Sequence, residues 1–303
     1  MNKERIQPLT AVLLALLFCQ ATHAQLFYSV NYATDELVEI DATTGNVSTV
    51  GGIGFDALNV DLAWLDGKLY GVDFDFGVRA DLYEFDLMTG AATQLGQLFD
   101  DNGVVVLNAE GLAVRNDQLV VGFTTVPGGF GSTNFGVLQL DGSIESVVNV
   151  GVDIDGFAND SDGQLFGMDS DFGNNENRLF SVDPFELIGI QNMGANAIED
   201  IAFLNETLFA ITNTGLARID QSTGALVSIL ILNPSSSNYS GLVAPNDGVL
   251  GDINCDGVVT LLDVSPFVAL ISGGGYSLKC DFNLDGEVNL NDVGPFVDSL
   301  VGF

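Results

Sequence analysis

Two acidic loops near the end of the chain share one spacing of oxygen-bearing side chains. They run from Asp252 to Asp263 and from Asp281 to Asp292. Each has Asp or Asn at its first, third and fifth positions, Gly at its sixth and Asp at its twelfth. Ca²⁺ takes six to eight hard oxygen ligands, and the Gly permits the sharp turn that wraps such a loop around the ion. The sequence therefore predicts two bound Ca²⁺ ions. The expected ligands, which include the carbonyl oxygens of residues 258 and 287, are Asp252, Asn254, Asp256, Val258, Thr260 and Asp263 in the first loop and Asp281, Asn283, Asp285, Glu287, Asn289 and Asp292 in the second.

The segment that carries both loops, residues 251–303, resembles a dockerin domain. Each loop ends in the run Asp-Val-x-Pro-Phe-Val, and dockerins consist of two such EF-hand-like halves, each a loop with its exiting helix. The resemblance implies a small α-helical calcium-binding domain that attaches its chain to a cohesin-like or cell-surface protein, commonly in polysaccharide breakdown. Helices are expected over 264–271 and 293–301, with Pro266 and Pro295 in their first turns, where a missing N–H costs little. The side chains expected to pack the two halves together are Phe267, Leu270, Phe296 and Leu300.

The segment departs from the dockerin pattern where a partner is selected. Both loops end in Asp, whereas full EF-hands usually end in Glu. Cellulosomal dockerins carry small hydroxyl residues just before that acid and a basic pair further along the helix. The residues found at these places are Leu261-Leu262, Leu290-Asn291, Val268-Ala269 and Val297-Asp298. Calcium binding is therefore implied residue by residue, whereas recognition of a cellulosomal type I cohesin is not.

Cysteine and histidine limit the available chemistry. Cys255 and Cys280 lie in the dockerin-like segment, and in a secreted chain they could form a disulfide or remain two buried thiols. The only histidine, His23, precedes the predicted signal-peptide cleavage after Ala24. Without histidine the mature chain has no Ser-His-Asp site, no Cys-His site and no histidine-bound zinc. Only chemistry that uses carboxylate, Tyr, Lys or Arg side chains remains.

The N-terminus and the overall charge predict a secreted protein. Lys3 and Arg5 precede an apolar run over 11–18, which is typical of a signal peptide and too short to span a bilayer. No later segment is long enough either, so we expect no membrane span. The formal net charge is −33, which excludes nucleic acid and anionic membranes as favourable partners.

An internal repeat of about 45 residues fills the chain between 25 and 248. Each unit has a strand of small and apolar residues, an Asp/Asn turn and a strand of the type Leu-aromatic-Gly. The third strand often ends in Asp-x-x-Thr-Gly. This run predicts a hairpin, because Asp can cap the turn and Gly accepts a positive φ. Four strands in each of about five units predict a β-propeller rather than a β-sandwich, the runner-up. The first unit begins at its second strand and the last stops after its first, so the two ends of the segment are expected to close the ring by completing one blade.

Acidic residues recur with the repeat. Three of the five residues that precede the expected innermost strands are acids, namely Glu110, Asp155 and Glu199. If these acids converge on the propeller axis, they could hold a cation. Alternatively, they only begin their strands at the solvated rim. This column is similar in outline to that of calcium-dependent lactonase propellers, whose histidine partners are missing here. A second set, expected in equivalent loops, could form a cation or sugar site or could be acidic turns kept from repeat duplication. Its members are Asp73, Asp75, Asp169 and Asp171. The single tryptophan, Trp64, is expected in the core.

These patterns divide the chain into a signal peptide (1–24), a β-propeller (25–248) and a dockerin-like calcium-binding domain (249–303). The favoured function is non-enzymatic: the propeller is a binding scaffold, and the C-terminal domain attaches it to a partner, with polysaccharide as a candidate ligand. One alternative is a carboxylate-based glycoside hydrolase on the propeller, drawing its acids from the two acidic sets above. The other is that the dockerin-like part only staples the propeller with calcium.

Overall fold

The computed structural model describes most of the chain after the predicted signal peptide, which lies outside the described residues. Also outside them are Cys255 and the calcium ligands predicted between 252 and 258 and between 281 and 287. The described residues are 26–75, 78–126, 133–160, 163–182, 185–192, 194, 196–204, 206–235, 238–245, 251, 259–273, 280, 282 and 288–301.

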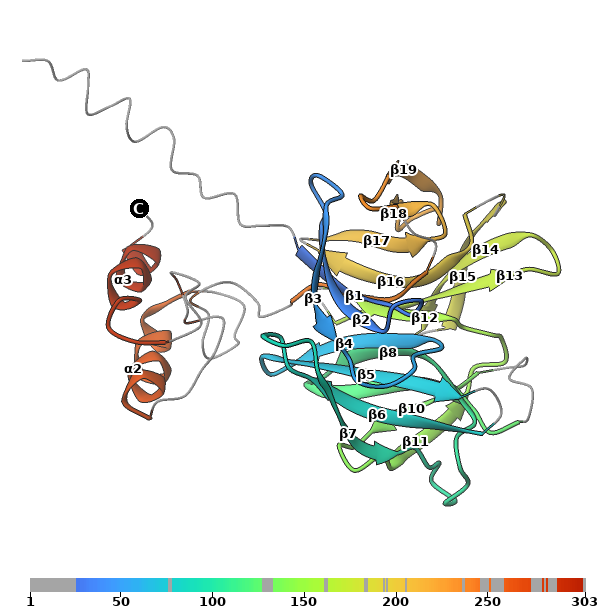
Figure 1. The fold of residues 1–303 in the computed structure, drawn as a ribbon, viewed down its shortest axis with the longest axis horizontal. Coiled ribbons are helices and arrows are strands. Elements are labelled where there is room, and N and C mark those ends of the chain that lie inside the picture. The colour runs from blue at the N-terminus through green and yellow to red at the C-terminus, as the bar shows by residue number, and fades with distance from the viewer. Residues whose placement is uncertain are drawn as a thin grey trace, which may run out of the picture.

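Within these residues, five four-stranded antiparallel sheets form a β-propeller (Figure 1). Five blades of four strands were predicted, and this prediction is confirmed. Four blades are continuous in sequence: β4 to β7, β8 to β11, β12 to β15 and β16 to β19. Their strands are β4 (Val60–Leu65), β5 (Lys68–Asp75), β6 (Arg79–Phe85), β7 (Ala92–Gln97), β8 (Asn108–Arg115), β9 (Gln118–Thr124), β10 (Asn134–Leu138), β11 (Ile144–Asn149), β12 (Gly156–Asn159), β13 (Leu165–Asp171), β14 (Glu176–Val182), β15 (Phe185–Asn192), β16 (Ile198–Leu204), β17 (Thr207–Thr212), β18 (Gly215–Ile219) and β19 (Leu226–Leu230).

The remaining blade draws strands from both ends of the propeller segment. Its order is β20, β1, β2, β3. The strands are β1 (Leu26–Asn31), β2 (Glu36–Asp41), β3 (Val47–Gly52) and β20 (Tyr239–Val243). β20 pairs antiparallel with β1, with Val30 opposite Ser240.

The first strand of each sequence unit is the innermost one. Strands β4, β8, β12, β16 and β20 each contact the next, and β20 contacts β4. Their side chains are mostly apolar and mostly buried, which suits strands whose two faces are both covered. The ends of these five strands therefore come together, and any polar residue placed at them faces residues from neighbouring blades.

The Asp-x-x-Thr-Gly turns are capped as the sequence predicts. The Oδ1 atom of Asp41 accepts hydrogen bonds from the backbone N–H groups of Thr43 (2.7 Å) and Thr44 (3.1 Å), and Gly45 has a φ of 75°. Asp86 and Asp220 do the same in the corresponding turns. Each turn joins the last two strands of its blade, which fixes their register.

The hydrophobic core lies between the faces of neighbouring blades. One cluster joins Val72 and Leu82 of one blade to Leu112 and Phe123 of the next. Trp64 is buried, as predicted, and its ring stacks on that of Tyr28 with centroids 6.0 Å apart.

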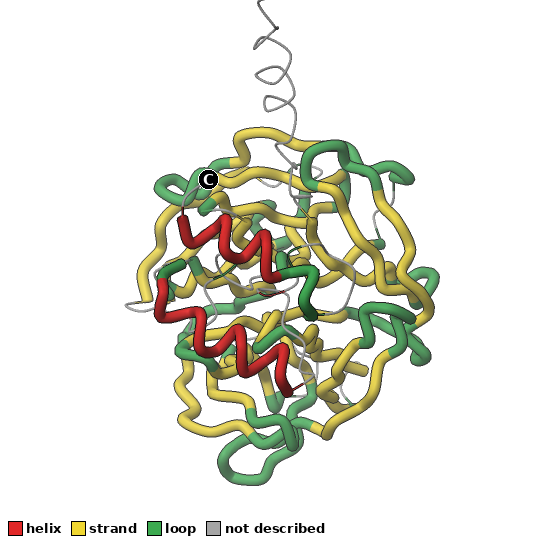
Figure 2. Tube along the Cα trace, turned by 90° about the vertical axis from the view of Figure 1, so that its left-hand side faces the viewer, coloured by secondary structure: helices red, strands yellow, loops and turns green. Residues whose placement is uncertain are grey.

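We call residues 251–301 the C-terminal module. Its described residues include a 3₁₀ turn (Leu261–Asp263) and two helices, α2 (Val264–Gly273) and α3 (Val293–Val301). Both helices begin where predicted, and α2 ends two residues later than 271. The helices lie side by side (Figure 2), and the rings of Phe267 and Phe296 are 4.1 Å apart. Among the described residues, no helix has the length and hydrophobicity needed to cross a membrane.

Candidate functional site

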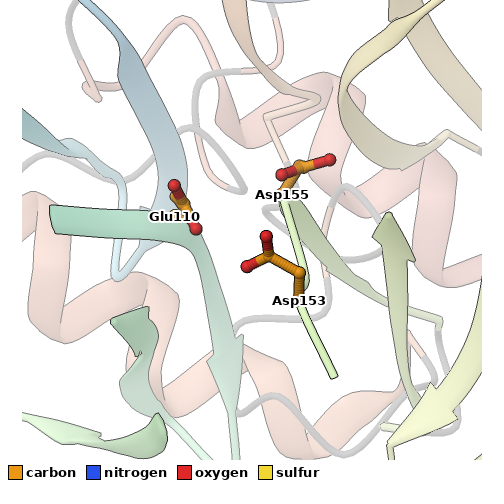
Figure 3. A group of neighbouring side chains, drawn as sticks. All are labelled: Glu110, Asp153 and Asp155. Carbon is orange, nitrogen blue, oxygen red and sulfur yellow. The ribbon is translucent and has the colours of Figure 1, made fainter. Parts of the chain in front are cut away.

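Three carboxylates come together where the inner strands β8 and β12 adjoin. Glu110 lies in β8, Asp155 immediately precedes β12, and Asp153 lies two residues earlier. The ligand oxygens of the three groups lie within 4.8 Å of one another. Figure 3 shows the three side chains around one common space, and we call this group the acidic cluster.

A β-bulge presents Glu110 to this space. The pairing of β8 with β9 shifts register between Ala109 and Leu112, so Glu110 and Gly111 have no regular partner in the ladder. A bulge bends its strand and re-aims a side chain. Gly111 has a φ of 92°, and a Cβ atom added there would lie 2.2 Å from the ring of Phe157. The close approach of β12 therefore requires glycine beside Glu110.

The segment before β12 presents the other two acids. Asp153 and Asp155 flank the buried Ile154, and alternate residues of an extended chain point to the same side. The N–H of Ile154 donates to Thr133 Oγ1 (2.9 Å), and the N–H of Asp155 donates to the carbonyl oxygen of Met168 (2.7 Å). Asp155 Oδ2 accepts a hydrogen bond from the N–H of Ser170 (2.6 Å). These bonds hold both carboxylates toward Glu110.

Further acids are buried beside the cluster at the same strand ends. Asp61 in β4 is fully buried, and its Oδ2 accepts a hydrogen bond from the N–H of Gly111 (2.8 Å). Asp200 in β16 accepts hydrogen bonds from the N–H groups of Leu242 (2.7 Å) and Ile201 (2.7 Å). These two acids therefore tie β4 to β8 and β16 to β20.

Burial disfavours the ionised form of these acids. The pKa of Glu110 rises to about 8, first because of burial and then because of the negative charge of Asp153. Burial raises the pKa values of Asp153 and Asp155 as well, and those of Asp61 and Asp200 lie well above their usual range for the same main reason. Like charges held this close are costly unless protons or a cation neutralise them.

The sequence predicted that Glu110, Asp155 and Glu199, which precede inner strands, could converge on the propeller axis, and the structure agrees in part. Glu110 and Asp155 come together, whereas Glu199 is not in the acidic cluster, although burial raises its pKa. Asp153 was missed. The available signal was its position two residues before Asp155, which places both side chains on one side of an extended segment.

The second predicted set does not lie in loops, as expected, but at the ends of the second strands β5 and β13. Strands β5 and β13 continue through these acids, because the backbone pairing with the next strand includes them. Asp73 lies opposite Asp81, and Asp169 lies opposite Arg178. Asp73 Oδ1 accepts hydrogen bonds from the N–H groups of Leu58 (3.2 Å) and Asn59 (3.3 Å). The side chain of Asp75 lies outside the described ones.

Arg178 contacts both predicted acids of β13. Its Nη2 lies 2.8 Å from Asp169 Oδ2 and also contacts Asp171 Oδ2. Burial raises the pKa of Asp169 to about 6, although the Arg178 charge opposes the change. Asp171 also caps its turn by accepting a hydrogen bond from the N–H of Asn174 (3.0 Å). These contacts stabilise the strand ends.

In the C-terminal module, the two predicted final ligands, Asp263 and Asp292, are fully buried. The Oδ2 atom of Asp263 accepts a hydrogen bond from the N–H of Thr260 (2.7 Å), and that of Asp292 accepts one from Asn289 (2.9 Å). Cys280 is buried. Since Cys255 lies outside the described residues, the disulfide stays a prediction.

The fold and the acidic cluster together define a five-bladed β-propeller with carboxylates at its inner strand ends. No protein-family model matches the chain, and no curated protein matches it. The chain is similar to a solved structure of a nidogen/laminin complex, with a TM-score of 0.45, 10% identity and coverage of 72% of this chain and 97% of that one. It is also similar to the PQQ-bound form of aldose sugar dehydrogenase from Streptomyces coelicolor, with a TM-score of 0.47, 12% identity and coverage of 73% and 82%. A protein of unknown function from Bacteroides caccae gives a TM-score of 0.42 at 11% identity, with coverage of 69% and 73%. None of these likenesses bears on the ligand or the activity of this chain.

Proposed function

We propose that the chain is a secreted modular protein whose propeller is a binding scaffold and whose C-terminal module binds two Ca²⁺ ions and docks onto a protein partner. The observation that carries this proposal is the repeated setting of Asp263 and Asp292. Both carboxylates are fully buried, and each accepts a hydrogen bond from the N–H three residues earlier. Each is the twelfth residue of its loop, and carboxylate oxygens are among the hard ligands that Ca²⁺ takes.

The donors of both loops fit calcium. Each loop offers carboxylate, amide and carbonyl oxygens, with Thr260 and Asn289 at the ninth positions. When bound, the ion neutralises the clustered carboxylates and draws each loop together. The module has a small buried cluster made mainly of Phe267, Val288 and Phe296. So small a core contributes little stability, which supports coupling of calcium binding to folding.

Four exposed apolar side chains support docking on the module. Leu261 and Leu290 are each 79% exposed and lie two residues before the final acid of their loops. Val268 and Val297 are also exposed and lie five residues after those acids. The two halves therefore offer equivalent apolar surfaces at the positions where cellulosomal dockerins carry their recognition residues. The partner is expected to be a cohesin-like or cell-surface protein with an apolar, uncharged contact face.

Calcium counting on the full mature chain tests the module. Asp263→Asn and Asp292→Asn should each remove one high-affinity ion in equilibrium dialysis, whereas Asp101→Asn, an exposed loop variant with the same charge change, should remove none. A panel of purified cohesin domains tests docking. Because the two surfaces are equivalent, Leu261→Lys or Leu290→Lys alone should weaken binding little, and the pair should abolish it. Unchanged calcium counts in both Asp variants would refute the module's role.

A carboxylate-based glycoside hydrolase is the second candidate function. The observation that favours it is the pKa of Glu110, about 8, beside Asp153 and Asp155, since such enzymes pair a protonated acid with an ionised one. The three acids are partly buried where the inner strands β8 and β12 adjoin, and a glycosidic bond must enter between two of their carboxyl groups for this chemistry. Reducing-sugar release from a polysaccharide panel that is lost in Glu110→Gln would establish the hydrolase. Glycan binding without release would support the scaffold.

The third candidate is a calcium staple, in which the module only stabilises the propeller. It predicts that Asp263→Asn with Asp292→Asn lowers the melting temperature of the propeller itself. Trp64 fluorescence reports that transition, because Trp64 is the chain's single tryptophan and lies in β4. Docking without stapling predicts an unchanged propeller transition.

A further inference from the structure

We propose that the acidic cluster of Glu110, Asp153 and Asp155 is a divalent-cation site, distinct from the calcium loops, that bridges the inner strands of two neighbouring blades. The three groups come from β8 and from the segment before β12, so one ion contacts both blades. Calcium–oxygen distances of about 2.3–2.6 Å place ligands on opposite sides of an ion about 5 Å apart. Carboxylate oxygens within 4.8 Å of one another satisfy this limit without movement of the backbone.

A second observation points to an ion independently of the cluster. Asp61 Oδ1 and Asn108 Oδ1 are buried oxygens without a hydrogen-bond partner among the described residues. Asp61 is 0% exposed and Asn108 is 3% exposed. A buried oxygen left without a partner costs about 1–3 kcal/mol. A cation satisfies such oxygens directly or through its bound water.

Both of these side chains lie beside Glu110. Asn108 Nδ2 donates a hydrogen bond to Glu110 Oε1, which places the amide against that carboxylate. Asp61 accepts a hydrogen bond from the N–H of Gly111, the residue that follows Glu110. The three carboxylates of the cluster and these two neighbouring side chains therefore lie at one junction.

Hydrogen bonds occupy the equivalent places at other junctions of the inner ring. Ser240 Oγ accepts a bond from the N–H of Val60 between β20 and β4 (3.1 Å), and Asp200 accepts the bond from Leu242 between β16 and β20. Between β8 and β12, three carboxylates face one another, and the hydrogen bond between Glu110 and Asp153 requires one of these two groups to carry a proton. When these carboxylates are ionised, their repulsion pushes the two blades apart. A cation bound between them would attract all three groups and so hold the blades together. The nearby cation, Arg178, is shared between Asp169 and Asp171.

The chemistry of the donors selects a hard divalent ion. The set consists of carboxylate and amide oxygens and contains no sulfur or imidazole, which suits Ca²⁺ or Mg²⁺ rather than zinc or copper. Calcium is expected to bind more tightly, because magnesium demands near-ideal octahedral geometry and gives up its water reluctantly. The cluster is only partly buried, so an ion can reach it and retain water.

The test counts ions on the full mature chain by equilibrium dialysis with calcium, and repeats the count with magnesium. The wild type should bind three calcium ions, and Asp153→Asn combined with Asp155→Asn should bind two. Glu199→Gln is the matched control, since it removes a partly buried acid at the equivalent position of β16, and it should still bind three. The Asp263→Asn and Asp292→Asn pair should retain one ion. If the calcium loops fail to bind, the wild type should still hold one ion that the cluster variant loses, so the two proposals can fail separately.

Thermal melting followed by Trp64 fluorescence supplies a second readout, the increase in melting temperature when calcium is added. Replacing acids that do not bind calcium would leave this increase unchanged. In EDTA, Asp153→Asn should melt above the wild type, because it relieves carboxylate repulsion. In calcium, the wild type should gain several degrees and the variant should gain little. Equal calcium counts and equal calcium-induced shifts for wild type and the cluster variants would overturn the proposal and leave a proton shared between Glu110 and Asp153 as the neutralising device.

Discussion

Replacing Gly111 by alanine probes the contact that places Glu110 in the acidic cluster. A Cβ atom at this position would lie 2.2 Å from Phe157 Cδ2 and 2.9 Å from Cε2, and the residue has a φ of 92°. The backbone conformation costs an L-residue about 1–2 kcal/mol. Overpacking against a buried ring adds about 1–3 kcal/mol. Gly111→Ala should therefore destabilise the propeller by about 2–5 kcal/mol, which corresponds to a fall of about 4–20 °C in melting temperature for a domain of this size.

Gly67 supplies the control for the backbone part of that cost. It has a φ of 76°, and an added Cβ atom would meet no described atom within 4 Å. Gly67→Ala should therefore cost only about 1–2 kcal/mol. Trp64 fluorescence melts of both variants isolate the contact with Phe157 as their difference. Phe157→Ala should cost less in the Gly111→Ala background than in the wild type, because the added methyl group then enters space left by the ring. Equal melting of Gly111→Ala and Gly67→Ala would refute the close approach of β12 to the bulge.

The other predictions concern the module, a turn and the ring. Phe267→Ala should destabilise the helical pair by about 3–5 kcal/mol, seen as faster amide exchange in α3, because the ring of Phe296 loses a neighbour at 4.1 Å; unchanged exchange would contradict the packing. Hydrogen bonds from the N–H groups of Met88 and Thr89 lower the pKa of Asp86 below its usual 3.8, so its stabilisation is present above pH 3.8 and is lost as the pH falls below it. Asp86→Asn, compared by urea denaturation, should be less stable than the wild type at neutral pH and converge with it in acid; a constant difference would exclude the charge effect. Leu242→Pro removes the N–H that donates to Asp200, so it should lower the urea midpoint more than Leu242→Ala does. Equal losses would show that this hydrogen bond does not stabilise the contact between β16 and β20.

The sequence predicted the parts of the fold that depend on local chemistry. The Asp-x-x-Thr-Gly turn specifies its own hairpin, because Asp41 caps the backbone and Gly45 takes the positive φ. Repetition of that turn with four apolar strands gave the number of blades. The prolines in the first turns of α2 and α3 marked where those helices begin.

The candidate site was harder to predict because it depends on contacts between blades. Glu110 and Asp155 were identified from their place in the repeat, but Asp153 joins them only because the segment before β12 is extended and anchored by Ile154. Glu199 holds the corresponding place in β16 and lies outside the cluster. Asp169 looked like a loop acid, and its pairing with Arg178 depends on the register of β13 with β14, which the spacing does not contain.

Anomalous diffraction from crystals of the mature chain grown with calcium would locate the proposed ions individually. We expect one calcium peak bounded by Glu110, Asp153 and Asp155, with Asp61 and Asn108 oxygens beside it, and one peak in each C-terminal loop next to Asp263 and Asp292. Peaks in the two loops and none between β8 and β12, with Glu110 and Asp153 joined instead by a direct hydrogen bond, would contradict the cation site in the propeller.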